Sequence, residues 1–247
     1  MARALGVIPA RLNSTRMKEK VLQQLHGRPM IQHVWERAKQ ARKLDEVIVA
    51  CDDPRIEKCV KEFGGKAMLT SPDHKNGTSR VAEVAKNEAA EVIINIQGDE
   101  PLIHPDAIDS LVREFNDDSD IEVATLAVQR EDRDEYNNPN VVKVVFDQNF
   151  DALYFSRSPI PHYREGAAVK VPFMKHLGIY GYKKAFLLKF VQWEMGKLED
   201  DEKLEQLRIL EKGFKIRVVQ TQHNSLSVDT SDDLDAVQSV MNQKGGL

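Results

Sequence analysis

The first candidate for chemistry is a run of cationic side chains at residues 11–20. Arg11, Arg16 and Lys20 lie in this run with Lys18 and two hydroxyl residues, directly after the first apolar segment of the chain. One guanidinium group can donate two parallel hydrogen bonds to phosphate oxygens, and a lysine adds a mobile positive charge. The glycine patterns of Walker loops and of dinucleotide sites are both absent. The run therefore indicates a polyphosphate site, and an ordinary exposed basic loop is the alternative.

Two aspartates stand where strands are expected to end. Asp99 follows the apolar run 92–96, and Asp229 follows a late strand and precedes a helix. Carboxylates at the carboxyl edge of a sheet are suited to holding Mg²⁺ against substrate phosphates. Each aspartate also has a structural explanation as a turn or helix-capping residue, and capping is favoured for Asp229 taken alone. Together the two are candidates for one shared metal site.

Hydrogen-bonding side chains in the second half of the chain form a third set of candidates. Arg157 follows an apolar segment and could bind a carboxylate through its paired N–H groups. Four further residues could bind hydroxyl groups, so that the whole set suits an acidic sugar: His176, Tyr180, Glu205 and Gln206. Each also has an ordinary explanation, since histidine and tyrosine often lie at the edge of a core and Glu205 can pair with Arg208.

A loop rich in hydrogen-bonding groups spans residues 70–80. It follows another apolar segment, so it could contact the edge of a nucleobase at the same side of a sheet. An ordinary turn before a helix capped by Thr78 or Ser79 is equally compatible with the pattern.

An α/β sheet would bring these loops together. Four short apolar segments, mostly β-branched, predict buried parallel strands: 5–8, 47–50, 66–69 and 92–96. Apolar residues at helical spacing predict helices over 30–41 and 108–115. Strands that alternate with helices predict right-handed crossovers and a doubly wound sheet, whose ligands bind beyond the carboxyl ends of the strands.

The pattern changes from about residue 121, where strands follow one another with fewer helices, as expected for an inserted lobe. The elements predicted here are strands at 123–126, 141–145, 152–155, 177–180 and 215–219, a charged helix at 198–212, and a last helix from Ser231. Polar stretches at 131–139 and 162–170 predict surface loops. Without an internal repeat or a clear linker, residues 1–247 are interpreted as a single domain.

Composition excludes several classes of protein. Of 247 residues, 41% are hydrophobic and 30% are charged, which is typical of a globular chain. The net charge of −4 provides no general positive field for nucleic acid, and the apolar runs are too short to cross a membrane. The two cysteines and unclustered histidines indicate neither a zinc site nor a disulfide framework. A reducing cytoplasm is the expected compartment.

Taken together, these motifs resemble those of the sugar-activating nucleotidyltransferases, and within them the CMP-Kdo synthetase (3-deoxy-manno-octulosonate cytidylyltransferase) family. The resemblance extends over nearly the whole chain. It depends on motifs within residues 8–20, 70–80, 97–101, 138–145, 152–161, 176–182, 204–208 and 228–230, among them Gln97-Gly98-Asp99-Glu100-Pro101.

The resemblance implies a reaction, a fold and an assembly. A Mg²⁺-dependent enzyme of this family transfers CMP from CTP to the anomeric hydroxyl of 3-deoxy-manno-octulosonate (Kdo), and releases pyrophosphate. The product serves lipopolysaccharide biosynthesis. The implied fold is Rossmann-like, a mostly parallel sheet flanked by helices of the nucleotide-diphospho-sugar transferase type, with an inserted lobe for dimerisation and sugar binding. A homodimer is typical of the family.

The resemblance also assigns roles to individual residues. It implies catalytic roles for Lys20, Asp99 and Asp229, with the two aspartates as metal ligands. The implied nucleotide-binding residues are Arg11, Arg16, Lys20, Arg80 and Gln97. The implied sugar-binding residues are Arg157, His176, Tyr180, Glu205 and Gln206.

The sequence is also compatible with three other functions. The segment 198–203 resembles the branch of the family that uses the 8-amino analogue of Kdo. A glycosyltransferase would also hold a metal through an aspartate, but its usual Asp-x-Asp is absent around Asp99. A nucleotide-sensing regulator on the same fold would not need Lys20, Asp99 and Asp229 together.

Overall fold

The computed structural model describes residues 2–13, 17–164 and 170–243. The strands in this part of the chain are β1 (Ala4–Ala10), β2 (Gln24–Leu25), β3 (Arg28–Pro29), β4 (Glu46–Cys51), β5 (Lys66–Leu69), β6 (Val92–Asn95), β7 (Val123–Arg130), β8 (Lys143–Phe146), β9 (Ala152–Ser156), β10 (Phe173–Lys183) and β11 (Arg217–Thr221). The α-helices are α1 (Met30–Lys39), α2 (Pro54–Glu62), α3 (Gly77–Asn87), α4 (Pro105–Asp117), α5 (Arg133–Asn137), α6 (Lys184–Phe190), α7 (Lys197–Glu202), α8 (Leu207–Glu211) and α9 (Ser231–Gln243).

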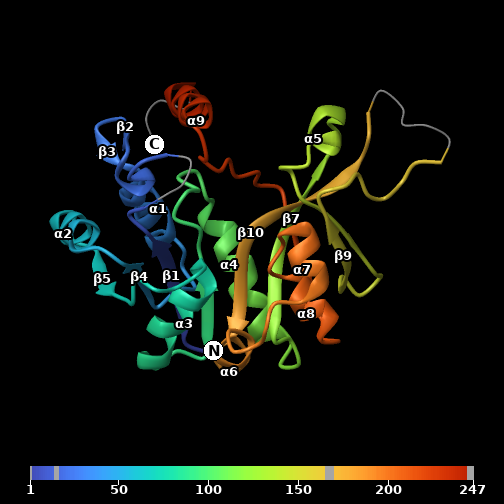
Figure 1. Cartoon of the computed structure of the whole chain (residues 1–247), viewed down its shortest axis with the longest axis horizontal. Helices are drawn as coiled ribbons and strands as arrows, with labels where there is room; N and C mark the ends of the chain where they lie inside the picture. The colour runs from blue at the N-terminus through green and yellow to red at the C-terminus, as the bar shows by residue number, and fades with distance from the viewer. Residues whose placement is uncertain (1, 14–16, 165–169, 244–247) are drawn as a thin grey trace.

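One sheet organises the molecule, with strand order β11-β7-β10-β6-β1-β4-β5 (Figure 1). The pairs β6–β1, β1–β4, β4–β5 and β11–β7 are parallel, whereas β10 is antiparallel to both β6 and β7. The predicted mostly parallel α/β fold is therefore confirmed. Because β1, β4 and β6 end at the same edge, the loops that follow them face the same space.

Helices cover both faces of the sheet. Alternate residues of β1 point to opposite sides, so Ile8 packs in a core with α1, α2 and α4, while Val7 packs in a second core with α3 and α6. The helical spacing predicted for 30–41 and 108–115 appears as α1 and α4, whose apolar stripes face the first core. Burial of both faces explains why these strands read as continuous apolar runs.

An inserted lobe extends from one end of β10. Figure 1 shows β10 continuing out of the sheet beside β9 and α5. There β8 pairs antiparallel with both β9 and β10. The register of β10 against β7 shifts between Leu177 and Tyr180. One long strand can therefore serve both the sheet and the lobe.

The structure corrects several predicted elements. The charged helix predicted at 198–212 is wrong, because Lys203 has a left-handed φ of 53° that ends α7 before α8 begins. The predicted loop at 131–139 contains α5, capped by the Asp132 side chain. The strand at 66–69 is β5, which lies at the sheet edge and is only partly buried. Part of the predicted loop at 162–170, residues 165–169, lies outside the described residues.

A buried lysine connects the segments around the lobe. Lys143 has no exposed surface, and its Nζ donates hydrogen bonds to the backbone oxygens of Asn138 (3.1 Å), Val141 (2.7 Å) and Arg157 (2.5 Å). Its burial lowers the pKa of Lys143. The three carbonyl oxygens nevertheless hold the ammonium group, and that of Asn138 also accepts the backbone N–H of Val141 at 3.1 Å.

We expect Lys143→Met to lower the free energy of unfolding by about 2–3 kcal/mol, because the apolar stem remains while three buried hydrogen bonds to the ammonium group are lost. Of the three carbonyl oxygens, that of Asn138 keeps the backbone N–H of Val141 as a donor. Urea denaturation measures this change. The matched control is Lys58→Met at a side chain that is 80% exposed, where we expect a change below about 0.5 kcal/mol. Equal stability of the two variants would contradict the anchoring role.

Candidate active site

A cavity of about 340 Å³ opens at the carboxyl ends of β1 and β6. Its lining includes five residues predicted from the sequence: Arg11, Lys20, Arg80, Gln97 and Asp99. The loop 74–77 forms another part of the wall. Arg16 lies outside the described residues, so its predicted nucleotide contact stays a prediction. The cavity is polar and cationic where the sequence places the polyphosphate site.

Lys20 joins the two aspartates. Its Nζ lies 2.6 Å from Asp99 Oδ2 and 3.0 Å from Asp229 Oδ1. Burial acts to lower the pKa of Lys20, but the two carboxylates outweigh it, and the pKa is raised above its ordinary value. Lys20 therefore stays cationic at neutral pH. The expected convergence of Asp99 and Asp229 on one place is confirmed.

Local contacts hold Asp229 in this position. The backbone N–H of Val228 donates to the carbonyl oxygen of Asp99 at 2.9 Å, which fixes the two segments side by side. The turn before α9 is closed by Asp233, whose Oδ2 accepts from the backbone amides of Asp229 and Thr230. Asp233 and Thr230 thus supply the capping contacts that the sequence favoured for Asp229. The Asp229 carboxylate instead contacts Lys20.

The aspartate pair fits a hard divalent cation. Both side chains are partly exposed, 27% for Asp99 and 38% for Asp229, and both already contact the same positive group. Carboxylate oxygens are the ligands that Mg²⁺ prefers, usually one or two from the protein with substrate phosphates completing the shell. The donor set therefore matches the predicted Mg²⁺ site in chemistry and in position beside the cavity.

One wall of the cavity is built from α3 and the loop before it. Arg80 is 3% exposed, and its guanidinium donates to Thr70 Oγ1 (2.6 Å) and to the carbonyl oxygen of Ser71 (3.2 Å). Asn76 caps α3 through the backbone N–H of Ser79, so capping by Thr78 or Ser79 is wrong. Arg80 both lines the cavity and holds its loop in place.

Gln97 and Gly98 connect the end of β6 to its neighbours. The Nε2 group of Gln97 donates to the carbonyl oxygen of Gly178 at 3.0 Å, which ties the cavity to β10. A Cβ atom at Gly98 would lie 2.8 Å from the backbone oxygen of Pro9. Only glycine therefore lets this loop approach the end of β1 so closely, and this approach places Asp99 at the cavity.

The predicted sugar-binding residues lie on β10, on the segment after β9, and at the start of α8. The rings of His176 and Tyr180 are 5.4 Å apart between centroids. The Arg157 guanidinium donates to three carbonyl oxygens, those of Glu202 (2.7 Å), Pro139 (3.0 Å) and Lys203 (3.4 Å). Counted over the described part of the chain, these bonds leave two of its five N–H groups for another acceptor.

Protonation states restrict what the predicted sugar-binding residues can bind. Burial lowers the pKa of His176, whose Nε2 lies 2.9 Å from Thr125 Oγ1. His176 is therefore a neutral hydrogen-bonding group at neutral pH. Burial likewise raises the pKa of Tyr180 well above 10. Among these residues Arg157 carries the positive charge.

Glu205 and Gln206 directly precede α8, and Glu205 contacts the start of α3 beside the cavity. Glu205 accepts hydrogen bonds from Thr78 Oγ1 (2.6 Å), Asn76 Nδ2 (2.8 Å) and an Arg208 nitrogen (3.2 Å). Burial raises the pKa of Glu205, although Thr78 and Arg208 oppose the shift. Gln206 is 6% exposed, and its Nε2 is buried without a hydrogen-bond partner among the described residues. A buried donor of this kind is unusual in a folded protein.

Sequence reasoning gave no role to His74 or Glu100. A ring nitrogen of His74 lies 2.5 Å from Glu83 Oε2, which also accepts from the Ser71 amide and so fixes the cavity loop. Glu100 is 7% exposed beside Asp99. In the sequence, only its position next to Asp99 indicated a role for Glu100. The burial of its side chain could not be predicted, because it depends on β10 and on the segment after β11.

The pKa of Glu100 predicts a pH dependence of stability. Burial, and next the charge of Asp99, raise this pKa from 4.5 to about 7. Between these two values the folded chain keeps a proton that the unfolded chain has lost, so stability should fall as the pH rises through this window. The full decrease is about 3 kcal/mol.

Urea denaturation from pH 5 to pH 8, in the presence of a chelator, measures this decrease. Glu100→Gln removes the titrating group, and we expect its stability to decline less over the same range. Parallel curves for the wild type and the variant would refute the raised pKa.

A family model described as cytidylyltransferase matches residues 5–216. A 3-deoxy-manno-octulosonate cytidylyltransferase of Solibacter usitatus is 51% identical, with 94% of this chain and 92% of the relative covered. A protein of the same name from Syntrophobacter fumaroxidans is 49% identical, with 98% of both chains covered. These relatives extend over almost the same length as this chain.

Two solved structures are similar to this chain, one at high and one at low sequence identity. A CMP:2-keto-3-deoxy-manno-octonic acid synthetase complexed with CTP superposes with a TM-score of 0.93 at 43% identity, covering 98% of this chain and all of the other. A 4-diphosphocytidyl-2C-methyl-D-erythritol synthase of Anaerococcus prevotii shares the fold, with a TM-score of 0.63 at 11% identity. Among the described residues, no helix is long and apolar enough to span a bilayer.

Proposed function

Because the chain belongs to the cytidylyltransferase family, we propose that it transfers CMP from CTP to the anomeric hydroxyl of Kdo and releases pyrophosphate. The observation that carries this function is the meeting of Lys20, Asp99 and Asp229 beside the cationic cavity. The relatives named as Kdo cytidylyltransferases, and the similar synthetase complexed with CTP, support the choice of both substrates.

The proposed reaction needs little covalent chemistry from the protein. The anomeric oxygen attacks the α-phosphorus as its hydroxyl proton passes to solvent. The bond from the α-phosphorus to the oxygen bridging the α- and β-phosphates breaks, and negative charge grows on the departing pyrophosphate. Arg11 and Lys20 are positioned at the cavity to stabilise this charge. Mg²⁺ held by Asp99 and Asp229 would neutralise phosphate charge and lower the pKa of the attacking hydroxyl.

The polar groups around β10 are proposed to hold the sugar. The two remaining N–H groups of Arg157 suit the Kdo carboxylate. The neutral His176 ring, the Tyr180 hydroxyl and the unpartnered Gln206 amide suit sugar hydroxyls. Glu205 contacts both Asn76, which lines the cavity, and Arg208 of α8. It therefore joins the proposed nucleotide site to the proposed sugar site.

Pyrophosphate release tests the function. The purified chain is assayed with CTP, ATP, GTP or UTP, each combined with Kdo, 8-amino-Kdo or sialic acid in the presence of Mg²⁺. We expect rapid release only with CTP and Kdo. A preference for 8-amino-Kdo would change the sugar but retain the reaction. No release with any pair would overturn the proposal, and would favour a glycosyltransferase or a nucleotide sensor.

A homodimer through the inserted lobe is part of the proposal. Leu153 on β9 is 62% exposed, and an apolar groove nearby is lined by Val144, Phe146, Tyr163 and Phe173. Exposed apolar surface of this kind is typical of an interface. A cytoplasmic location is also proposed, supported by two cysteines that are both free.

Sedimentation velocity tests the dimer. We expect the wild type to sediment as a dimer and Leu153→Glu to shift toward monomer, because the variant would bury a charge in the interface. Leu69→Glu is the matched control, since Leu69 is 46% exposed on β5, away from the lobe. A wild-type monomer, or equal effects of the two variants, would count against this interface.

A further inference from the structure

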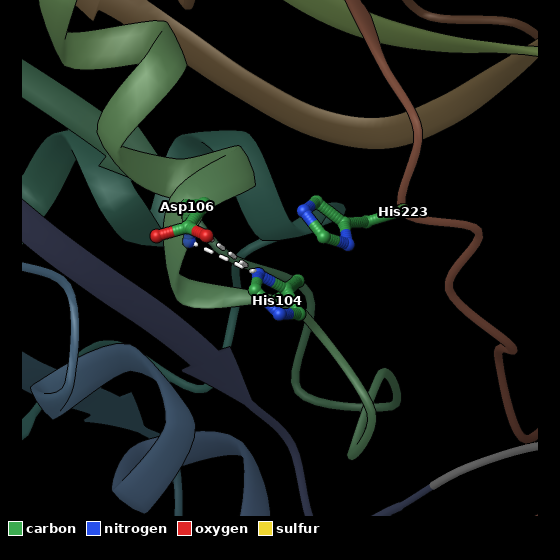
Figure 2. A group of neighbouring side chains, drawn as sticks. All are labelled: His104, Asp106 and His223. Atoms are coloured by element: carbon green, nitrogen blue, oxygen red, sulfur yellow. Dashed lines mark hydrogen bonds and ion pairs between the residues drawn. The ribbon is translucent and has the colours of Figure 1, made fainter.

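Two histidines that are far apart in the sequence meet beside an aspartate. His104 precedes α4, Asp106 lies in the first turn of α4, and His223 lies in the segment after β11 (Figure 2). One potential ligand atom from each of the three lies within 4.8 Å of the others. The imidazole rings are stacked, with centroids 3.5 Å apart and planes 1° apart. The two histidines are 119 positions apart in the sequence, so their pairing exists only in the folded chain.

The donor chemistry of this cluster differs from that of the aspartate pair. Two imidazole nitrogens and one carboxylate suit ions such as Zn²⁺, Co²⁺ and Ni²⁺, whereas Mg²⁺ prefers oxygen ligands alone. Three protein ligands leave the fourth position of a tetrahedral ion to water. The cluster is therefore unlike the Mg²⁺ site in the ion that it would select.

The distance between two of the three ligand atoms is close to that of a tetrahedral site. With bonds of about 2.0–2.1 Å, two ligand atoms of a tetrahedral Zn²⁺ lie about 3.4 Å apart. His104 Nδ1 and Asp106 Oδ2 are separated by 3.7 Å. An ion must lie near the plane of each ring that binds it, so the stacked rings must turn about their Cβ–Cγ bonds. The His104 side chain is 35% exposed and His223 is half-buried, so neither ring is enclosed by the core, and the Asp106 carboxylate is 74% exposed and can turn toward them.

We propose that His104, Asp106 and His223 bind one divalent transition-metal ion of the Zn²⁺ class. The Nδ1 atom of His104 now accepts the backbone N–H of Asp106 at 3.2 Å, and in the metal-bound state water would replace it at this exposed helix start. The ion would cross-link the loop after Asp99 to the segment that leads to Asp229. The same two segments already share the hydrogen bond from Val228 to Asp99.

Metal titration of the full chain tests the site. With Mg²⁺ in excess, Zn²⁺ binding is measured by calorimetry and Co²⁺ binding by visible absorption, both without substrates. We expect one ion per chain, with an absorption band typical of tetrahedral Co²⁺. His104→Asn and His223→Gln should each weaken binding by about tenfold or more. His104→Asn keeps a side-chain acceptor that can cap α4, and circular dichroism checks folding.

His162→Gln is the matched control, because His162 is exposed but lies in the lobe. We expect it to bind Zn²⁺ like the wild type. As a second measurement, Zn²⁺ should shift the imidazole NMR signals of His104 and His223 before those of the other histidines. Unchanged binding in both cluster variants, an equal loss in the control, or no selective shift would overturn the site and leave only a stacked imidazole pair. Because no substrate is present, these results are independent of the transferase activity.

Discussion

Replacing Asp99 with asparagine is expected to lower kcat by about a thousandfold, or about 4 kcal/mol of transition-state stabilisation. The two side chains have nearly the same shape, but asparagine has no negative charge with which to hold a cation. In the proposed reaction this loss falls on the step in which phosphate charge is redistributed. Lys20 keeps Asp229 as a partner at 3.0 Å, so we expect the fold to survive.

Steady-state kinetics with varied Mg²⁺ measure this effect, and thermal unfolding checks the fold. Asp117→Asn is the matched control, since Asp117 is exposed at the end of α4, and it should retain wild-type kcat. An Asp99→Asn enzyme with wild-type turnover and the same Mg²⁺ requirement would exclude Asp99 as the metal ligand.

Replacing Lys20 with methionine is expected to lower kcat/KM for CTP by about a hundredfold or more, while the dissociation constant for the sugar stays nearly unchanged. Methionine keeps the apolar stem but removes the positive charge. The triphosphate then loses a charge partner at the cavity, and the carboxylates of Asp99 and Asp229 lose the cation that they share.

Lys18→Met provides the control for this variant. Lys18 lies in the same loop, but it is exposed and does not line the cavity. Kinetics with varied CTP, together with sugar binding by calorimetry, separate the two substrates. If both variants used CTP equally well, the special position of Lys20 between the aspartates would have no catalytic meaning.

Much of the fold followed from local sequence patterns. Runs such as 92–96 predicted strands because a strand buried on both faces must be apolar on both faces. The spacing in α1 and α4 predicted helices because one stripe of each faces the core. The alternation of the two elements then placed Asp99 and the first cationic loop at one edge of the sheet, as the structure confirms.

Other elements depended on backbone conformations and contacts with no local signal. The charged segment 198–212 has helical composition, yet the left-handed Lys203 divides it into α7 and α8. Arg157 was recognised as a carboxylate-binding candidate, but its bonds to Pro139, Glu202 and Lys203 could not be read from its neighbours in the sequence.

The sequence by itself determined most of the longer strands and helices, the sheet edge that carries the cavity and the motifs that resemble one family. Only the tertiary structure decided which side chains meet there. Lys20 contacts Asp99, 79 positions away in the sequence, and Asp229, 209 positions away. His104, between β6 and α4, stacks on His223, which follows β11. The physical reason is that periodicity records the burial of each residue within its own element, whereas these contacts arise from the packing of separate elements into one sheet.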